Sequence, residues 1–390
     1  MKLNDDIVFF TGGGTAGHIY PGLAVAERLR SLAERDGRKL TVCWIGSSKG
    51  MDRNIVTSAL TASGKNAVDM FFGIPAGKLR RYLSLKNLSD LFRVLGGFFA
   101  AKRILRKYKP AVVFSKGGFV SVPPCFAART LGIPVFAHEC DFSLGLANRL
   151  NFKSAEKMLV SYEETKNRLG ADGQDRVVVT GNPVRPVFHS ASASSGLSFL
   201  GIPPAHEKPV LLVLGGSSGS RQINELVHEN LVWLCERFIV VHQTGLLNTA
   251  TGLAVGLPDN LRCDYKPYDF IYKEMPDVMA ASDVILSRAG ANSLWEAAVL
   301  LKPMVLVPLC GSGTRGDQVD NARFFKSKNA ALVLLGDEAS GGNLKSSLEV
   351  MLEKSKRDEF AAALKSLMPE KAPEEQIAAL VYARICGGEK

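Results

Sequence analysis

The sequence of 390 residues lacks several patterns that would assign it to a class at once. Its seven cysteines include no Cys-x-x-Cys pair, and this odd, scattered set argues against a disulfide framework or a zinc site and predicts reduced thiols in a cytoplasmic setting. No Asp-x-Asp pair occurs, so we expect no obligatory metal ion. The chain runs through Asp5 and Asp6 straight into an apolar segment, and we therefore expect no signal peptide.

The composition bounds the class of protein and the number of domains. Hydrophobic residues make up 46% of the chain and charged residues 22%, which is typical of a globular protein and excludes a disordered or fibrous one. A chain of 390 residues is long for a single hydrophobic core. We therefore expect two domains of ordinary size.

Positive charge is concentrated in one segment. Residues 73–109 contain ten Lys or Arg and one acidic residue, Asp90, and so carry nearly all of the net charge of +10. The charges interrupt the apolar residues between them too often for a membrane span, which takes about 20 apolar residues. Two interpretations remain: a basic amphipathic surface lying on an anionic membrane, or a solvated basic helix face whose apolar side, especially at residues 92–99, belongs to the core. No nucleic-acid-binding motif accompanies the charge, and we expect no nucleic-acid partner.

The stretch FFTGGGTAGHIYP, residues 9–21, is the most informative part of the first half. An apolar run at residues 7–11 leads into three glycines, and residues 22–32 carry apolar residues at helical spacing. A helix N-terminus beside such a loop suits a phosphate or a sugar oxygen, and its dipole favours a neutral, proton-accepting imidazole at His18. The alternative is a packing turn with a solvated or capping histidine. Because the stretch is neither a Walker loop nor a Gly-x-Gly-x-x-Gly motif, taken alone it favours that alternative.

The first half of the chain alternates strands and helices. Further strands are predicted at residues 40–46, 68–72, 111–115, 134–138, 157–161 and 176–180, and a long helix at residues 85–108. This alternation predicts a doubly wound parallel sheet. A second glycine turn at residues 116–121 and a polar segment at residues 138–148 follow two of the strands, at the edge where such sheets bind ligands.

The same pattern starts again in the second half. Two prolines at residues 181–186 mark a boundary, and a strand at residues 210–214, a Gly/Ser loop and a helix at residues 222–235 follow it. We therefore predict an α/β protein with two Rossmann-like domains facing each other across a cleft. The last helix, residues 374–385, is expected to pack back on the first domain.

The turn at residues 288–293 lies between a predicted strand and a helix that begins at residue 294 and holds Glu296 in its first turn. The amides of Asn292 and Ser293 suit a phosphate, and the Glu296 carboxylate suits the vicinal hydroxyls of a ribose. The alternative is a capping box, in which Ser293 and Glu296 bond only the helix backbone. Spacing alone favours the capping box.

Seven motifs in order make these interpretations more specific than any one of them alone. They are GGGTAGHIYPGLAVAE (12–27), SKGGFVSVP (115–123), IPVFAHECDFSLGLANR (133–149), GNPVR (181–185), LGGSSGSRQIN (214–224), SRAGANSLWEA (287–297) and RGDQVDNA (315–322). On these motifs, which cover nearly the full length, the sequence resembles the MurG family of bacterial cell-wall N-acetylglucosaminyltransferases.

The resemblance implies a GT-B fold with an acceptor-binding, membrane-facing domain at residues 1–184 and a UDP-sugar-binding domain at residues 185–369, the C-terminal helix (370–390) packing on the first. It implies inverting transfer of GlcNAc from UDP-GlcNAc to the C4 hydroxyl of the muramoyl sugar of undecaprenyl-linked lipid I, which makes lipid II. No cofactor is implied. The expected location is the cytoplasmic face of the plasma (inner) membrane, as a peripheral protein on an anionic surface, with other cell-wall synthesis proteins as candidate partners.

The resemblance also implies roles for single residues. His18 corresponds to the proposed general base, Arg185 and Ser217 to the diphosphate contacts, and Ile271, within one or two positions, to the residue whose backbone reads the uracil. The residues expected to bind UDP-GlcNAc are Thr15, Ala16, Gly17, Asp141, Arg185, Ser217, Ile271, Ala291, Asn292, Ser293, Glu296 and Gln318. The residues expected at the membrane and acceptor surface are Lys78, Arg80, Arg81, Tyr82, Lys86 and Phe92.

Two positions depart from the family pattern, and three rival functions remain. Asp141 and Asp317 stand where an amide is usual, and a carboxylate accepts from sugar hydroxyls but cannot donate to a carbonyl or phosphate. The rivals are another GT-B lipid glycosyltransferase, such as a diacylglycerol glycosyltransferase, a sugar-nucleotide epimerase, and a non-catalytic nucleotide-sugar-binding scaffold. The segment HECDFSLGLANR disfavours the first, and His18 together with the whole donor set disfavours the scaffold. An epimerase would consume UDP-GlcNAc without an acceptor.

Overall fold

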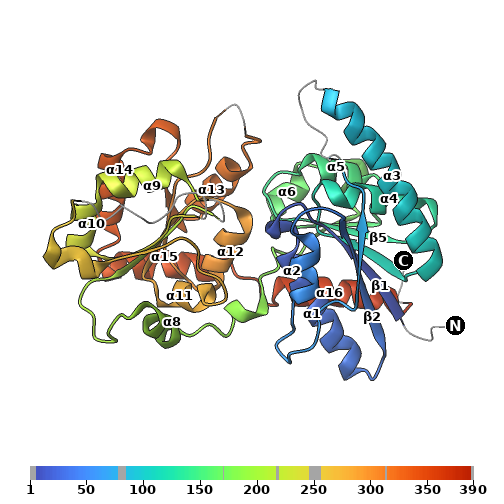
Figure 1. Ribbon diagram of the computed structural model, residues 1–390, viewed down its shortest axis with the longest axis horizontal. Coiled ribbons are helices and arrows are strands. Elements are labelled where there is room, and N and C mark those ends of the chain that lie inside the picture. The colour runs from blue at the N-terminus through green and yellow to red at the C-terminus, as the bar shows by residue number, and fades with distance from the viewer. Residues whose placement is uncertain are drawn as a thin grey trace. The chain divides into compact units, whose positions relative to one another are not determined.

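The computed structural model describes residues 6–77, 85–169, 171–216, 219–245, 256–311 and 314–387 (Figure 1). At residues 85–89, 171 and 172 it describes the backbone alone. The chain divides into a first unit, Met1–Arg185 with Pro369–Lys390, and a second unit, Pro186–Met368. Each unit is built on its own parallel sheet with helices on both faces, so the predicted α/β fold with two doubly wound sheets is confirmed.

The first unit has a seven-stranded sheet in the order β3-β2-β1-β4-β5-β6-β7, with parallel neighbours throughout. Its strands are β1 (Asp6–Thr11), β2 (Leu40–Ser47), β3 (Met70–Ile74), β4 (Val112–Ser115), β5 (Val135–Glu139), β6 (Lys157–Val160) and β7 (Val177–Val179). Its helices are α1 (Tyr20–Arg35), α2 (Asp52–Ser58), α3 (Leu85–Tyr108), α4 (Val122–Thr130), α5 (Leu146–Phe152), α6 (Glu163–Asn167), α7 (Ala171–Gln174) and α16 (Pro373–Ile385), with the short 3-10 helices η1 (Ala16–His18) and η2 (Phe119–Ser121). The strand order reverses between β1 and β4, so the loops after these two strands lie at the switch point where open α/β sheets bind ligands.

Strand β1 is buried on both faces of its sheet, and its alternating side chains enter two separate cores. Phe10 packs in one core with residues of α1 and α16 such as Leu29 and Val381. Phe9, its neighbour, packs in the other core with residues of α3 and α4 such as Leu105. This follows from the twofold side-chain period of a strand. It also shows that the C-terminal helix α16 completes the core of the first unit.

The second unit has a six-stranded sheet in the order β10-β9-β8-β11-β12-β13, again with parallel neighbours. Its strands are β8 (Val210–Leu214), β9 (Ile239–Gln243), β10 (Tyr265–Tyr268), β11 (Val284–Ser287), β12 (Met304–Leu306) and β13 (Ala331–Val333). Its helices are α8 (Ala193–Leu200), α9 (Arg221–Glu229), α10 (Leu231–Arg237), α11 (Met275–Ala281), α12 (Ala291–Val299), α13 (Asp317–Ser327), α14 (Gly341–Val350) and α15 (Lys354–Ser366), with the 3-10 helices η3 (Pro186–Phe188), η4 (Asp259–Asp264) and η5 (Gly336–Glu338). Here the order reverses between β8 and β11, which brings the loops after residues 214 and 287 to the switch point.

One predicted helix is wrong in its extent. The helix expected at residues 222–235 is two helices, α9 and α10, separated at Asn230. The backbone of Asn230 has φ −114° and ψ 12°, and its side-chain amide donates to the carbonyl of Leu226 at 2.7 Å. An asparagine side chain that bonds the preceding turn in this way competes with helix continuation.

Two further expectations from the sequence concern reduced cysteines and the lack of a membrane span. All seven cysteines are free in the structure, and four of them are buried. Across the described residues, no helix has both the length and the apolar character that crossing a bilayer requires.

Candidate active site

His18 lies in the loop after β1, at the end of η1 and just before α1. Its Nδ1 lies 2.7 Å from the hydroxyl oxygen of Thr15, and its side chain is half-buried. The second glycine turn, after β4, lies against the ring: a Cβ built on Gly118 would lie 3.2 Å from Cγ of His18. Gly118 has φ 78°, a conformation that favours glycine. The two glycine turns found in the sequence therefore meet around the imidazole.

The glycine turn that precedes His18 is anchored by two side chains from neighbouring elements. The indole N–H of Trp44, on β2, donates to the carbonyl of Gly12 at 3.0 Å. The carboxylate of Asp52, the first residue of α2, accepts the N–H of Gly14 at 2.9 Å. Sequence reasoning identified neither anchor, because Gly14 and Asp52 are 38 residues apart and no local motif links them.

The buried histidine at the end of β5 is a structural group. His138 lies between the ammonium of Lys116, 2.8 Å from its Nδ1, and the carbonyl of Gly181, 2.9 Å from its Nε2. Burial lowers the pKa of His138 well below its ordinary value, and the charge of Lys116 lowers it further. The imidazole is therefore neutral: it donates its Nε2–H to Gly181 and accepts from Lys116 at Nδ1. This places a buried cation directly before the turn that contacts His18.

Glu139 holds the polar loop that follows β5. Its carboxylate accepts the N–H groups of Asp141 and Gly145 at 3.1 and 2.9 Å and the side-chain amide of Asn148 at 3.1 Å. Glu139, Cys140 and Asp141 also bring potential metal ligands within 4.8 Å of one another. However, both carboxylate oxygens of Glu139 already accept hydrogen bonds from these N–H donors. The arrangement suits a loop clamp better than a metal site.

Arg185 belongs to the first unit, although the sequence placed it at the start of the second domain. Its guanidinium lies over the ring of Tyr20, 4.9 Å from the ring centroid. Tyr20 begins α1, two residues after His18. A cation–π contact of this kind fixes the direction of the arginine side chain.

In the second unit, the helix after β11 begins earlier than the sequence suggested. Its N-cap is Gly290, and its first backbone hydrogen bond runs from the N–H of Leu294 to the carbonyl of Gly290 at 3.1 Å. The backbone amides of Ala291, Asn292 and Ser293 therefore form the helix N-terminus, where a phosphate is favoured. The capping-box interpretation of Ser293 and Glu296 is wrong, because the cap is a glycine without a side chain and Glu296 lies in the second turn, half-buried and one turn after Asn292.

Two side chains hold the loop that leads into α12. Asn321, fully buried on α13, donates to the carbonyl of Ala289 at 3.1 Å. The guanidinium of Arg288 donates to the side-chain oxygen of Gln222 at 2.8 Å and to the carbonyl of Val307 at 2.9 Å. These bonds tie the loop after β11 to the first turn of α9, to Val307 directly after β12 and to α13. The helix N-terminus is thus preorganised by contacts with these elements.

The structure changes what Ile271 and Gln318 can offer to a ligand. The N–H of Ile271 donates to the side-chain oxygen of Gln243 at 2.9 Å, so a ligand at Ile271 would meet the backbone carbonyl and not this N–H. The side-chain oxygen of Gln318 accepts the N–H of Leu309 at 3.0 Å, so a ligand at Gln318 would meet the NH₂ group as a donor. Asp317 forms an ion pair with Arg315 at 2.7 Å and is half-buried.

Several residues predicted for the binding site or the membrane surface lie outside the described residues. Ser217, Lys78, Arg80, Arg81 and Tyr82 lie outside the described residues, as does the side chain of Lys86. Phe92 is 66% exposed on α3, so the alternative that assigned the apolar side of residues 92–99 to the core is wrong for it. Among the described side chains of the helix (residues 90–108), Leu91, Leu95 and Phe99 are also exposed.

Comparisons with protein families and with relatives agree over most of the chain. The model of the glycosyltransferase family 28 N-terminal domain matches residues 8–160, and that of the glycosyltransferase family 28 C-terminal domain matches residues 210–380. A Treponema denticola protein is 52% identical over 85% of this chain and 84% of its own length, and a Clostridium botulinum protein is 39% identical over 89% and 91%. Both carry the name UDP-N-acetylglucosamine--N-acetylmuramyl-(pentapeptide) pyrophosphoryl-undecaprenol N-acetylglucosamine transferase.

Solved structures share the fold at low sequence identity. The crystal structure of Acinetobacter baumannii MurG has a TM-score of 0.71 at 23% identity and covers 96% of this chain and 99% of its own. A UDP-GlcNAc 2-epimerase from Neisseria meningitidis, bound to UDP-GlcNAc, has a TM-score of 0.64 at 15% identity and covers 98% of this chain and 100% of its own. At these identities the likeness shows the fold alone, and the fold is shared by a transferase and an epimerase.

Proposed function

The chain belongs to glycosyltransferase family 28, and from that membership we propose that it transfers GlcNAc from UDP-GlcNAc to the muramoyl sugar of undecaprenyl-linked lipid I, forming lipid II for peptidoglycan synthesis. The observation that carries the proposal is the 52% identity, over 85% of the chain, to a relative named for this reaction. The fold by itself would not distinguish transfer from epimerisation. The identity and the His18 loop together favour transfer.

The reaction we infer is an inverting displacement with His18 as general base. The C4 hydroxyl of the acceptor attacks the anomeric carbon of the donor from the face opposite UDP, and His18 accepts the hydroxyl proton. This role requires the tautomer in which Nδ1–H donates to the Thr15 oxygen, 2.7 Å away, because Nε2 then carries the lone pair. The same hydrogen bond stabilises the imidazolium that forms.

The leaving UDP gains negative charge as the glycosidic bond breaks. We propose that Arg185, Ser217 and the N-terminus of α12 at Asn292 and Ser293 stabilise this charge. In this scheme the Glu296 carboxylate accepts hydrogen bonds from the ribose hydroxyls. In the same scheme, the rest of the donor set binds the base and the sugar through Ile271, Gln318, Asp141, Ala291, Thr15, Ala16 and Gly17.

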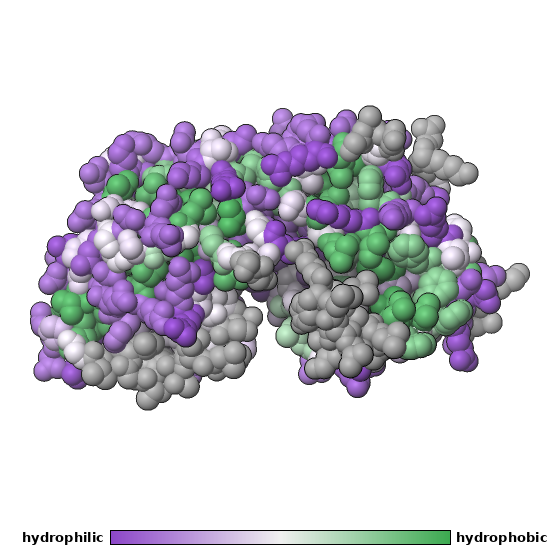
Figure 2. Space-filling model, turned by 90° about the horizontal axis from the view of Figure 1, so that it is seen from above, coloured by the Kyte–Doolittle hydropathy of each residue, from purple (hydrophilic) through white to green (hydrophobic). Residues whose placement is uncertain are grey.

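We further propose that α3 carries the membrane-facing surface of the acceptor side. Leu91, Phe92, Leu95 and Phe99 are 48%, 66%, 47% and 66% exposed, a large apolar exposure for one helix. Figure 2 views the side on which α3 lies in Figure 1, and apolar areas bordered by hydrophilic ones cover this part of the first unit. An apolar strip next to cations suits the surface of an anionic bilayer, with the protein peripheral on its cytoplasmic face.

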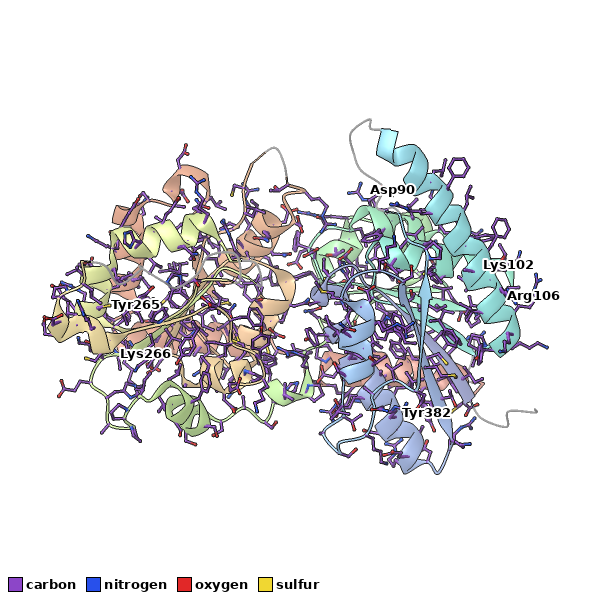
Figure 3. The ribbon with its side chains drawn as sticks, viewed as in Figure 1. Asp90, Lys102, Arg106, Tyr265, Lys266 and Tyr382 are labelled. Carbon is purple, nitrogen blue, oxygen red and sulfur yellow. The ribbon has the colours of Figure 1, made fainter. Side chains whose placement is uncertain are left out.

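The basic end of α3 adds a second element to this surface. A shallow basin of about 310 Å³ is lined by Phe99, Lys102, Arg103, Arg106 and Lys107. In Figure 3, Lys102 and Arg106 extend from the outer side of the helix, away from the sheet. Such a row of cations next to exposed phenylalanines suits lipid phosphate groups at the bilayer surface.

The test is UDP release from UDP-GlcNAc with and without a short-chain lipid I analogue, using detergent-solubilised protein. Release that requires the analogue and yields a β-1,4-linked disaccharide is the expected result. Consumption of UDP-GlcNAc without the analogue would favour an epimerase or hydrolase. Release with diacylglycerol in place of the analogue would favour the rival lipid glycosyltransferase, and binding without any turnover would favour the scaffold.

A further inference from the structure

Asp52 is a buried carboxylate that contacts the backbone of the loop leading to His18. It is 1% exposed, and it begins α2 directly after the loop that follows β2. One of its oxygens accepts the N–H of Gly14 at 2.9 Å, and the other accepts the N–H of Ser47 at 2.8 Å. A single side chain thus bonds the last residue of β2 and the loop that follows β1.

The contact is close because glycines leave room for the carboxylate. A Cβ built on Gly13 would lie 1.9 Å from Oδ2 of Asp52, and one built on Gly46 would lie 3.3 Å from its Cβ. Any larger residue at position 13 would displace the carboxylate. Gly13 is therefore explained by packing against this side chain, whereas Gly46 is held to glycine first by Phe71, whose ring atoms would lie 2.8 Å from a Cβ there.

The two hydrogen bonds of Asp52 should be stronger than ordinary backbone hydrogen bonds. A carboxylate that accepts backbone N–H groups makes charge-assisted hydrogen bonds, roughly twice as strong as neutral ones, and burial shields them from water. Within the described part of the chain Asp52 forms no ion pair, so these bonds are what compensates its burial. Losing one of them leaves a buried polar group without a partner.

We propose that Asp52 is a positioning residue for the transfer reaction, which fixes the glycine turn so that the imidazole of His18 is held in place. The amide anchored by Asp52 belongs to Gly14, and the next residue, Thr15, makes the hydrogen bond to Nδ1 of His18. The line of contacts runs from the carboxylate through one peptide unit to the base. The proposal rests on the proposed function, because it gives His18 the role of base.

The first test is Asp52→Asn, with Asp69→Asn as the matched control. An amide has one acceptor oxygen and an NH₂ group that faces a second N–H, so Asp52→Asn loses one of the two bonds. Asp69 also accepts a backbone N–H of β2, that of Val42 at 2.7 Å, but at the start of the strand, remote from the loop at its end. Unlike Asp52 it is exposed and forms an ion pair with Arg30, so it matches Asp52 in the bond to the backbone and not in burial. We expect Asp52→Asn to lower kcat at saturating substrates at least tenfold, with UDP affinity within twofold of wild type. Asp69→Asn should keep kcat within twofold of wild type, even if its melting temperature falls as much as that of Asp52→Asn.

Amide hydrogen exchange separates positioning from general destabilisation. In Asp52→Asn the peptide covering residues 9–19 should exchange faster, while peptides of the second unit keep their wild-type rates. Asp52→Ser, which keeps one acceptor in a smaller side chain, serves as the second variant if the first does not fold, and the same changes are expected.

Three results would overturn the proposal. They are a kcat within twofold of wild type in both Asp52 variants, an equal loss of kcat in Asp69→Asn, and unchanged exchange at residues 9–19 despite a lost kcat. A wild-type protein that releases no UDP with the lipid I analogue would instead overturn the proposed function. That result is recognised before any variant is compared.

Discussion

The hydroxyl oxygen of Thr15 lies 2.7 Å from Nδ1 of His18, three residues further along the same loop. This bond occupies one ring nitrogen with a group from the protein itself. Because a neutral imidazole carries one proton, the direction of the bond decides whether Nε2 accepts or donates. Only the tautomer that donates from Nδ1 to Thr15 leaves a base at Nε2.

Replacing His18 by alanine should stop turnover and leave the nucleotide bound. General-base catalysis typically contributes 10²- to 10⁴-fold, so we expect kcat for His18→Ala to fall by roughly that factor. Affinity for UDP, measured by titration calorimetry, should stay within about twofold. Equally weakened UDP binding would mean that His18 supports the nucleotide site and would remove the base assignment.

Thr15→Val tests the tautomer directly. Valine has nearly the shape of threonine but no oxygen to accept the Nδ1–H, so less of the neutral imidazole holds its lone pair at Nε2. We expect kcat to fall between roughly twofold and tenfold, the range of a single neutral hydrogen bond. Thr15→Ser keeps the oxygen and should restore most of the rate. A serine variant as slow as the valine variant would point to the methyl group instead.

Glu296 and Ser293 separate ligand binding from helix capping. Because the N-cap of α12 is Gly290, Ser293→Ala should leave the stability of the second unit unchanged within about 0.5 kcal/mol in urea unfolding. Glu296→Ala should weaken UDP-GlcNAc binding roughly 10- to 100-fold, since it removes hydrogen bonds to a charged acceptor. Loss of stability in Ser293→Ala with unchanged affinity in Glu296→Ala would return the capping interpretation.

The architecture could be predicted from the sequence because local hydrophobic patterns determine most of its strands and helices. Alternating apolar runs predicted all seven strands of the first sheet, and α3 begins and ends at the predicted residues. In the second sheet the strands β8 and β11 were predicted, whereas β9, β10 and β13 were not. The ligand-binding edge of each sheet could be predicted because glycine-rich loops follow predicted strands, whereas the switch points became visible only in the strand order. What failed were local signals that a second local group overrides, namely the side chain of Asn230 within a predicted helix and Gly290 as the cap of α12.

The supporting contacts of the site were not predictable in the same way. Asp52 and Gly14 are 38 residues apart, and Gln243 and Ile271 are 28 residues apart. Each pair meets only because parallel strands align at one edge of a sheet, and no spacing rule indicates it. The chemistry of a candidate base is therefore visible in the sequence, whereas the groups that orient it appear only in the fold.

The stability of both units should decrease as the pH falls below the pKa of an ordinary histidine, about 6.5. Burial lowers the pKa of His138 in the first unit well below its usual value and that of His242 in the second unit to about 4. Below pH about 6.5 the unfolded chain therefore binds protons that the folded chain does not, so stability is present above this pH and is lost on acidification. For His242 the loss between pH 7 and pH 5 is about 2 kcal/mol.

Urea unfolding of wild type and His242→Gln at pH 7 and pH 5 measures this dependence. His242 bonds Tyr265 and Asn224, so the variant should be less stable at pH 7. It should nevertheless lose less stability than wild type between pH 7 and pH 5, because glutamine does not titrate. An equal loss in both proteins would assign the pH dependence to other groups.

The apolar strip of α3 should bind anionic bilayers through two separable contributions. Phe92→Ser and Phe99→Ser each remove a phenyl group that is 66% exposed, and we expect each to weaken binding to vesicles containing phosphatidylglycerol about tenfold at any salt concentration, because burying a phenyl group stabilises by about 1.5–3 kcal/mol. Lys102→Glu with Arg106→Glu should weaken binding mainly at low salt, since exposed charges are screened at high ionic strength.

Tyr272→Ser is the matched control: Tyr272 is also 66% exposed but belongs to the second unit, and its loss should leave vesicle binding unchanged. If Tyr272→Ser weakens binding as much as Phe92→Ser, α3 is not the docking surface and exposed aromatic residues bind the vesicles without preference for a site.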